Sequence, residues 1–170
     1  SVIALAYGFY LARLVLAEDP GSPKMVEVAA AIEEGAMAYL RQQIRTMSWF
    51  VAAAFIVLVL MYLEEYGKVL ALGVGISFLA GVAASYGAGY VGMWLAVKGN
   101  VRAANGALRS FKEAFRIAFQ AGTVSGMFTV GFGLLGATLI FLIFKEDAMK
   151  VLIGFGFGGT LAALFMRVGG

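Results

Sequence analysis

The sequence predicts an all-α integral membrane protein, a multi-span helical bundle with about five transmembrane helices. Of its 170 residues, 62% are hydrophobic and 14% are charged, and the mean hydropathy is +0.90. A soluble domain is typically about 45–50% apolar and about a quarter charged. The apolar residues also come in blocks of about twenty, the length that a helix needs to cross a bilayer. Composition and block length together place the chain in a lipid bilayer.

The first two spans are separated by a turn and a polar helical segment. Residues 18–23 (EDPGSP) form a turn-forming cluster, in which Ser22 can cap the next helix and Pro23 fits its first turn. Residues 24–45 are amphipathic, so we expect the second helix to begin in water or among headgroups before it enters the bilayer. The expected spans lie at approximately residues 2–17, 46–63, 69–97, 114–144 and 148–167.

The later spans are divided by polar segments. Residues 64–68 (EEYGK) and 145–147 (KED) read as short turns, and residues 98–113 form a basic segment. Residues 1–170 therefore form a single transmembrane helical region. We expect this region to be the N-terminal part of a larger membrane domain, cut at both ends.

The orientation follows from the Lys and Arg residues near the span ends, because cytoplasmic ends carry the excess. Three of the 13 fall on one side, at Lys68, Lys145 and Lys150. The other ten fall on the opposite side, at Arg13, Lys24, Arg41, Arg45, Lys98, Arg102, Arg109, Lys112, Arg116 and Arg167. We expect the ten-residue side to be cytoplasmic and the first residue to lie outside.

Small residues recur at four-residue spacing, which places them on one helix face, where membrane helices can approach closely. The pairs Gly122 with Gly126 and Gly154 with Gly158 show this spacing, as does the series Gly81, Ser85 and Gly89. The spacing predicts a compact bundle. Residues 154–160 (GFGFGGT) resemble a phosphate-binding loop, but they lack its Gly-Lys-Ser/Thr ending, so we interpret these glycines as packing positions.

The composition excludes several kinds of chemistry. The chain has no Cys and no His, so it offers no disulfide, no thiolate metal site and no imidazole base. Its basic residues stand at the ends of apolar blocks rather than along one polar face, which argues against a nucleic-acid partner. No paired acids, activated nucleophile or cluster of metal ligands is visible, so we predict no catalytic residue and no metal ligand in this chain.

Several charged residues allow more than one interpretation. Glu33, Glu34, Arg41 and Arg45 form a stripe that we interpret as a solvated face. The same interpretation applies to Asn100, Arg102 and Asn105, which could instead cap or link helices. Arg167 ends an apolar, glycine-rich helix, where it either anchors the helix at the headgroups or pairs with a carboxylate in a polar interior. On these observations alone, a non-hydrolytic transporter or channel subunit fits best.

Three stretches carry a resemblance to the membrane-bound, ion-pumping inorganic pyrophosphatases. Residues 32–43 (IEEGAMAYLRQQ) resemble an early helix motif of that family, and residues 89–102 (GYVGMWLAVKGNVR) resemble its GxxGMxxAxxxNxR signature. Residues 154–158 (GFGFG) with 163–170 (ALFMRVGG) are similar to its fifth span. Ala103 departs from the family, which often has Thr there, as do residues 159–161 (GTL), where Ala-Ser-Ser is frequent.

The resemblance implies a homodimer of sixteen-helix subunits, with the first four spans here as outer scaffold and the fifth in the inner ring. It implies hydrolysis of cytoplasmic magnesium pyrophosphate by a water activated between aspartates, coupled to outward transport of H⁺ or Na⁺. Arg167 matches the family's ion-coupling Arg, which pairs with an acid of the sixth span. The implied cofactors are Mg²⁺ and, in some members, K⁺. The pyrophosphate-binding residues, the pumped ion and K⁺ dependence are determined outside this sequence.

Overall fold

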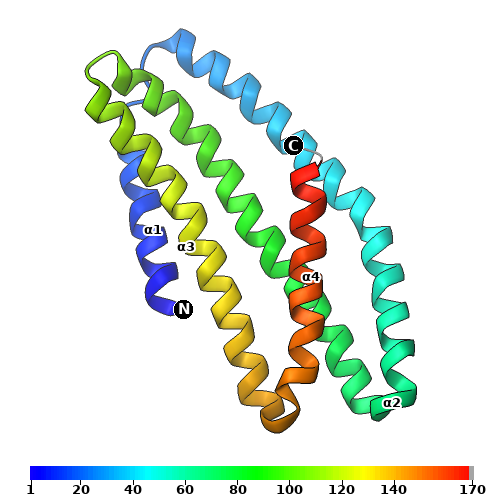
Figure 1. Ribbon diagram of the computed structural model, residues 1–170. Helices are drawn as coiled ribbons and strands as arrows, with labels where there is room; N and C mark the ends of the chain where they lie inside the picture. Colours follow the sequence, from blue (N-terminus) through cyan, green and yellow to red (C-terminus); the bar gives the residue numbers. More distant parts are fainter. Residues whose placement is uncertain (169–170) are drawn as a thin grey trace. The chain divides into compact units, whose positions relative to one another are not determined.

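The computed structural model describes residues 1–168, with side chains described for residues 1–166. Within this range the chain is helical apart from residue 1 and the short loops at residues 18–22 and 108–110, and it contains no β-strand (Figure 1). The elements are α1 (Val2–Ala17), α2 (Pro23–Ala107), α3 (Phe111–Phe144), the short 3-10 helix η1 (Lys145–Asp147) and α4 (Ala148–Val168). The prediction of an all-α protein is confirmed.

Two helical stretches are long and apolar enough to cross a membrane. They are Pro23–Ala107 and Phe111–Met166, and the shorter helix Val2–Ala17 is also apolar. The second stretch contains η1, at the predicted turn of residues 145–147. Length and composition are therefore those of a membrane helical protein.

The long helix α2 is divided by Gly67, whose backbone has φ 75° and ψ 173°, a conformation almost restricted to glycine. We name residues 23–66 the first arm and residues 68–107 the second arm. Figure 1 shows the chain reversing at this point. The turn predicted at residues 64–68 is confirmed, although only one residue leaves the helical conformation.

The start of α2 is also as predicted. Ser22 is the N-cap, and its Oγ accepts a hydrogen bond from the backbone N–H of Met25 at 3.4 Å. Pro23 occupies the first turn, where its missing N–H costs nothing. The first arm then continues without a break through the amphipathic residues 24–45.

The chain divides into two compact units. The first comprises Ser1–Arg41 and Ala88–Gly131, and the second comprises Gln42–Gly87 and Phe132–Gly170. Each unit thus takes part of α2 and part of α3, so segments far apart in the sequence share a core.

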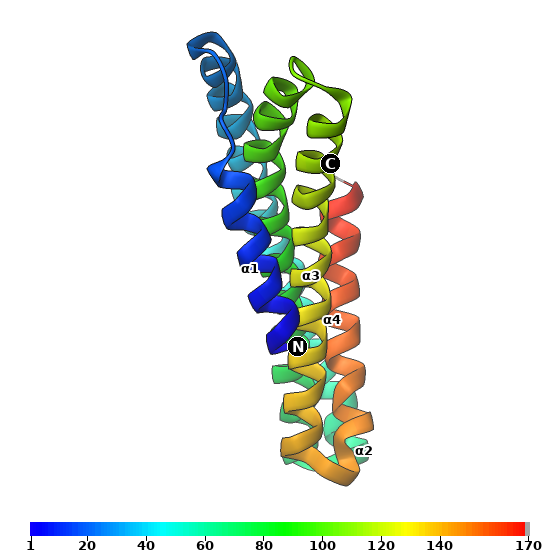
Figure 2. The same cartoon turned by 90° about the vertical axis from the view of Figure 1, so that its left-hand side faces the viewer.

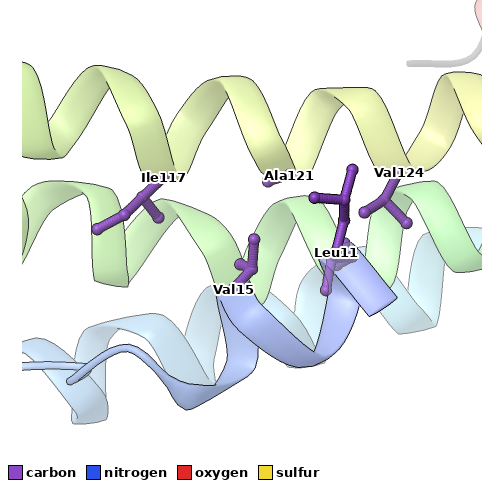
Figure 3. Packing of buried hydrophobic residues seen from close by; sticks show 6 residues of the cluster. Leu11, Val15, Ile117, Ala121 and Val124 are labelled. Carbon is purple, nitrogen blue, oxygen red and sulfur yellow. The ribbon is translucent and has the colours of Figure 1, made fainter. Parts of the chain in front are cut away.

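The core of the first unit lies where α1, the second arm and α3 meet. Figure 2 shows α1 running beside α3, and Figure 3 shows the buried side chains between the helices. A Cβ added at Gly99 of the second arm would lie 2.9 Å from the Cβ of Ala121, so the helices need a glycine there to pack this closely. The buried cluster consists of Leu11, Val15, Leu95, Ile117, Ala121 and Val124.

In the second unit, α4 packs against the second arm through glycines. A Cβ added at Gly154 would overlap the carbonyl oxygen of Val74, and one at Gly158 would overlap that of Phe78. On the facing helix, a Cβ at Gly81 would overlap the carbonyl oxygen of Phe155. The packing role predicted for Gly154, Gly158 and Gly81 is confirmed, and residues 154–160 are helical rather than a phosphate loop. The same prediction is wrong for Gly156, where an added Cβ would meet no described atom within 4 Å.

The prediction is wrong for Gly122 and Gly126. A Cβ at either position would meet no atom of the described chain within 4 Å. The reason is that α3 buries the face that carries Ile117, Ala121 and Val124, and the two glycines lie beside that face and are exposed. Four-residue spacing shows which residues share a face, but not which face is packed.

Candidate functional site

The most connected polar side chain of the first unit is Arg102, near the end of the second arm. Its Nε donates to the carbonyl oxygen of Glu18 at 3.0 Å, and its Nη2 donates to that of Leu16 at 3.2 Å. Its Nη1 donates to the carbonyl oxygen of Lys98, one turn earlier, at 2.8 Å. The last carbonyls of a helix lack partners within it, so Arg102 satisfies acceptors at the end of α1. Of the two interpretations of Arg102, helix linking is confirmed.

The loop that follows α1 is held by two further contacts. The side-chain amide of Asn105 donates to the carbonyl oxygen of Asp19 at 3.1 Å. Arg116 of α3 forms an ion pair with the carboxylate of Glu18 at 2.8 Å. Arg102 and Asn105 of the basic segment, together with Arg116 of α3, therefore bind the end of α1 and the loop after it.

The stripe at residues 33–45 divides into paired and unpaired groups. The Nζ of Lys98 lies 2.6 Å from Oε2 of Glu33, with the two side chains 34% and 27% exposed. This pair joins the motif of residues 32–43 to that of residues 89–102. Glu34, Arg41 and Arg45 are exposed and form no ion pair in the described part of the chain. The solvated interpretation holds for these three residues and is wrong for Glu33, because the second arm brings a cation beside it.

A residue that the sequence analysis missed lies at the end of the first motif. The Nε2 of Gln43 donates to the carbonyl oxygen of Phe165 at 2.8 Å, across 122 positions of sequence. This hydrogen bond links the first arm to the last turns of α4. The available signal was an amide side chain just before the apolar block, but its acceptor is a backbone atom that no residue type reveals.

The predicted ion-coupling residue, Arg167, belongs to α4 by its backbone. Its side chain lies outside the described part of the chain, as do Gly169 and Gly170. Contacts of Gly154, Gly158 and Gln43 define the position of the helix that carries Arg167. The position of the guanidinium is not described.

The described residues do not form a magnesium site. Among residues 1–166, no three or more Asp or Glu side chains gather where they could hold a metal ion. Magnesium requires several oxygen ligands, usually carboxylates together with water or phosphate. The polar contacts described above hold helices together.

Comparison with known proteins reveals the same relationship that the three motifs indicate. The sequence profile of the family described as "Inorganic H+ pyrophosphatase" matches residues 2–170. A "K(+)-insensitive pyrophosphate-energized proton pump" of Chloroflexus aurantiacus is 45% identical over 185 residues, covering 100% of this chain and 24% of the relative. A pump of the same name from Streptomyces coelicolor is 44% identical over 184 residues, covering 100% of this chain and 23% of the relative.

A third relative, from Bacteroides thetaiotaomicron, carries the words "pyrophosphate-energized sodium pump" in its name. It is 36% identical over 186 residues, which cover 100% of this chain and 25% of the relative. The chain spans about a quarter of the length of these relatives. Because the profile match extends over nearly every residue, the chain belongs to the inorganic H⁺ pyrophosphatase family.

Proposed function

We propose that this chain is the N-terminal part of a membrane-bound pump that couples hydrolysis of cytoplasmic pyrophosphate to outward ion transport. The observation that carries the proposal is the match over the whole chain, at 45% identity, to a pyrophosphate-energized proton pump. The helical, strongly apolar structure agrees with it. The non-hydrolytic transporter or channel subunit loses its support, because the relatives' names describe pumps energized by pyrophosphate.

This part of the pump forms five spans, of which the first four serve as outer scaffold and the fifth belongs to the inner ring. We assign the spans to residues 2–17, 46–63, 69–97, 114–144 and 148–167, as one transmembrane region that includes all of residues 1–170. The break at Gly67 and the 3-10 helix η1 support the division, because each interrupts a longer helical stretch. With 34 residues, α3 is about 50 Å long and exceeds the roughly 30 Å hydrocarbon core, so it tilts or protrudes.

The orientation rests on charge. With ten Lys and Arg residues on one side and three on the other, the ten-residue side is cytoplasmic and residue 1 lies outside. Arg102 and Arg116, which bind the end of α1, would then lie on the cytoplasmic side, the side of hydrolysis.

We assign ion coupling to Arg167. A guanidinium at the end of an apolar helix is costly unless it reaches headgroups or pairs with an acid. The close packing of Gly154 and Gly158 against the second arm supports the assignment, because it fixes the helix that carries Arg167. Its acidic partner would come from the following span, outside this chain.

The substrate is magnesium pyrophosphate, and its magnesium ligands would come from the remaining three quarters of the protein. Bound magnesium neutralises the charge that develops on phosphoryl oxygens. We propose that the pumped ion is H⁺ and that the pump is insensitive to K⁺. The relatives at 45% and 44% identity are named K⁺-insensitive proton pumps, whereas the relative named a sodium pump is 36% identical. The whole protein is proposed to be a homodimer.

The test is phosphate release by the purified full-length protein, supplied with magnesium and either pyrophosphate or ATP. We expect hydrolysis of pyrophosphate and not of ATP, and no hydrolysis without magnesium. If folded protein hydrolyses neither compound, the transporter hypothesis replaces the pump.

A further inference from the structure

The last turns of α4 are held by one face of the first arm. Gln43, Met47 and Phe50 are spaced by four and three residues, so they share a helix face. Met47 is fully buried in a cluster that includes Ala162 of α4, and the rings of Phe50 and Phe165 lie 5.4 Å apart. Two apolar contacts and one hydrogen bond therefore join this face to α4.

The hydrogen bond differs in kind from the apolar contacts. Apolar burial is non-directional, so the contacts of Met47 and Phe50 set no particular distance or angle between the two helices. The bond from Nε2 of Gln43 to the carbonyl oxygen of Phe165, at 2.8 Å, requires a particular distance and angle. It therefore fixes both the axial position and the rotation of α4 at a point two residues before Arg167.

We infer that Gln43 is a positioning residue, which sets the place of the Arg167 guanidinium through the backbone of α4. The inference rests on the proposed function, in which Arg167 couples hydrolysis to ion transport. A small displacement of a group that must meet its partner in one geometry is enough to impair a coupled step. Loss of the Gln43 donor therefore reduces coupling while pyrophosphate binding, located elsewhere, is unchanged.

The chain offers variants that separate donation from simple packing. Gln43→Glu has nearly the same shape, but its carboxylate cannot donate a hydrogen bond. Gln43→Lys keeps an N–H donor on a side chain of similar reach. Gln42→Glu is the matched control, because Gln42 is the neighbouring residue and is exposed.

The experiment measures ions transported per pyrophosphate hydrolysed by the full-length protein in sealed vesicles, together with the KM for pyrophosphate. We expect Gln43→Glu to lower the ratio by about two- to tenfold, the range that the loss of one hydrogen bond allows, with KM unchanged. Gln43→Lys and Gln42→Glu should keep the wild-type ratio. Gln43→Met, which removes the donor without adding charge, replaces Gln43→Glu if that variant does not fold.

Two results would overturn the inference, and they differ from a failure of the proposed function. The first is a wild-type ratio in both Gln43→Glu and Gln43→Met. The second is an equal loss in Gln43→Lys, since that would make the side chain's size and not its donor the important property. A failure of the proposed function is recognised separately, because the wild-type protein itself would then show no pyrophosphate-driven transport.

Discussion

The Nε of Arg102 donates a hydrogen bond to the carbonyl oxygen of Glu18 at 3.0 Å, joining the second arm of α2 to the end of α1. With its bonds to Leu16 and Lys98, this one guanidinium satisfies three carbonyl oxygens. A guanidinium carries five N–H donors in a fixed plane, which suits several acceptors at once. Arg102 therefore acts as a clamp on α1, and the Arg of the family signature has a structural explanation.

Removing the clamp should loosen the end of α1. In the full-length protein we expect Arg102→Ala to lower the free energy of local opening around residues 14–22 by about 2 kcal/mol, which corresponds to about thirtyfold faster amide exchange. Arg102→Lys should give part of this effect. Hydrogen exchange provides the measurement, with Arg109→Ala as control, because the ion pair of Arg109 in the described part of the chain is with its neighbour Glu113 on the surface. Unchanged exchange in Arg102→Ala would contradict the clamp.

The close packing of α4 against the second arm leads to a second prediction. Gly158→Ala places a Cβ against the carbonyl oxygen of Phe78, so we expect destabilisation of about 3 kcal/mol. Gly156→Ala is the matched control on the same helix, because a Cβ there meets no described atom within 4 Å. The midpoint of thermal unfolding of the solubilised protein measures both. Equal midpoints for the two variants would mean that the helices do not approach as described.

The reversal at Gly67 predicts opposite effects for two Gly→Ala changes. Gly67 has φ 75° and ψ 173°, so Gly67→Ala should cost about 1–3 kcal/mol through backbone strain alone, since its Cβ would meet no described atom. Gly35 is helical and exposed, so Gly35→Ala should be neutral or stabilising, because alanine favours helix. Thermal unfolding compares the two, and a Gly67→Ala protein as stable as wild type would refute the strained turn.

Arg167 is tested through coupling rather than folding. We expect Arg167→Ala to abolish or strongly reduce ion transport per pyrophosphate, and to slow hydrolysis, while the protein stays folded and dimeric. Vesicle transport and phosphate release measure the two activities, and size-exclusion chromatography checks assembly. Normal transport per pyrophosphate in this variant would remove Arg167 from the coupling path.

Much of the fold could be predicted because its signals are local. The Ser22 cap and the Gly67 turn depend on neighbouring residues, and each is found where expected. The packing of Gly154 and Gly158 was also predictable, since small residues on one face allow close approach. Gly122 shows the limit of this reasoning, because the spacing alone does not tell which face of α3 is buried.

The partners in the polar links of the site could not be predicted. Arg102 bonds to backbone carbonyls 84 and 86 positions away, and Gln43 to one 122 positions away. A backbone carbonyl is the same for every residue type, so the sequence does not mark these acceptors. The pairing of Glu33 with Lys98 was missed for a related reason, since it depends on how the two arms of α2 meet.

The most direct test of the central claim is ion movement driven by pyrophosphate. The full-length protein is reconstituted into sealed vesicles, and magnesium pyrophosphate is added to the cytoplasmic face while internal pH and Na⁺ are followed. We predict acidification of the vesicle lumen that depends on pyrophosphate, needs no K⁺, is not supported by ATP and collapses with a protonophore. Hydrolysis of pyrophosphate without movement of either ion would contradict the account.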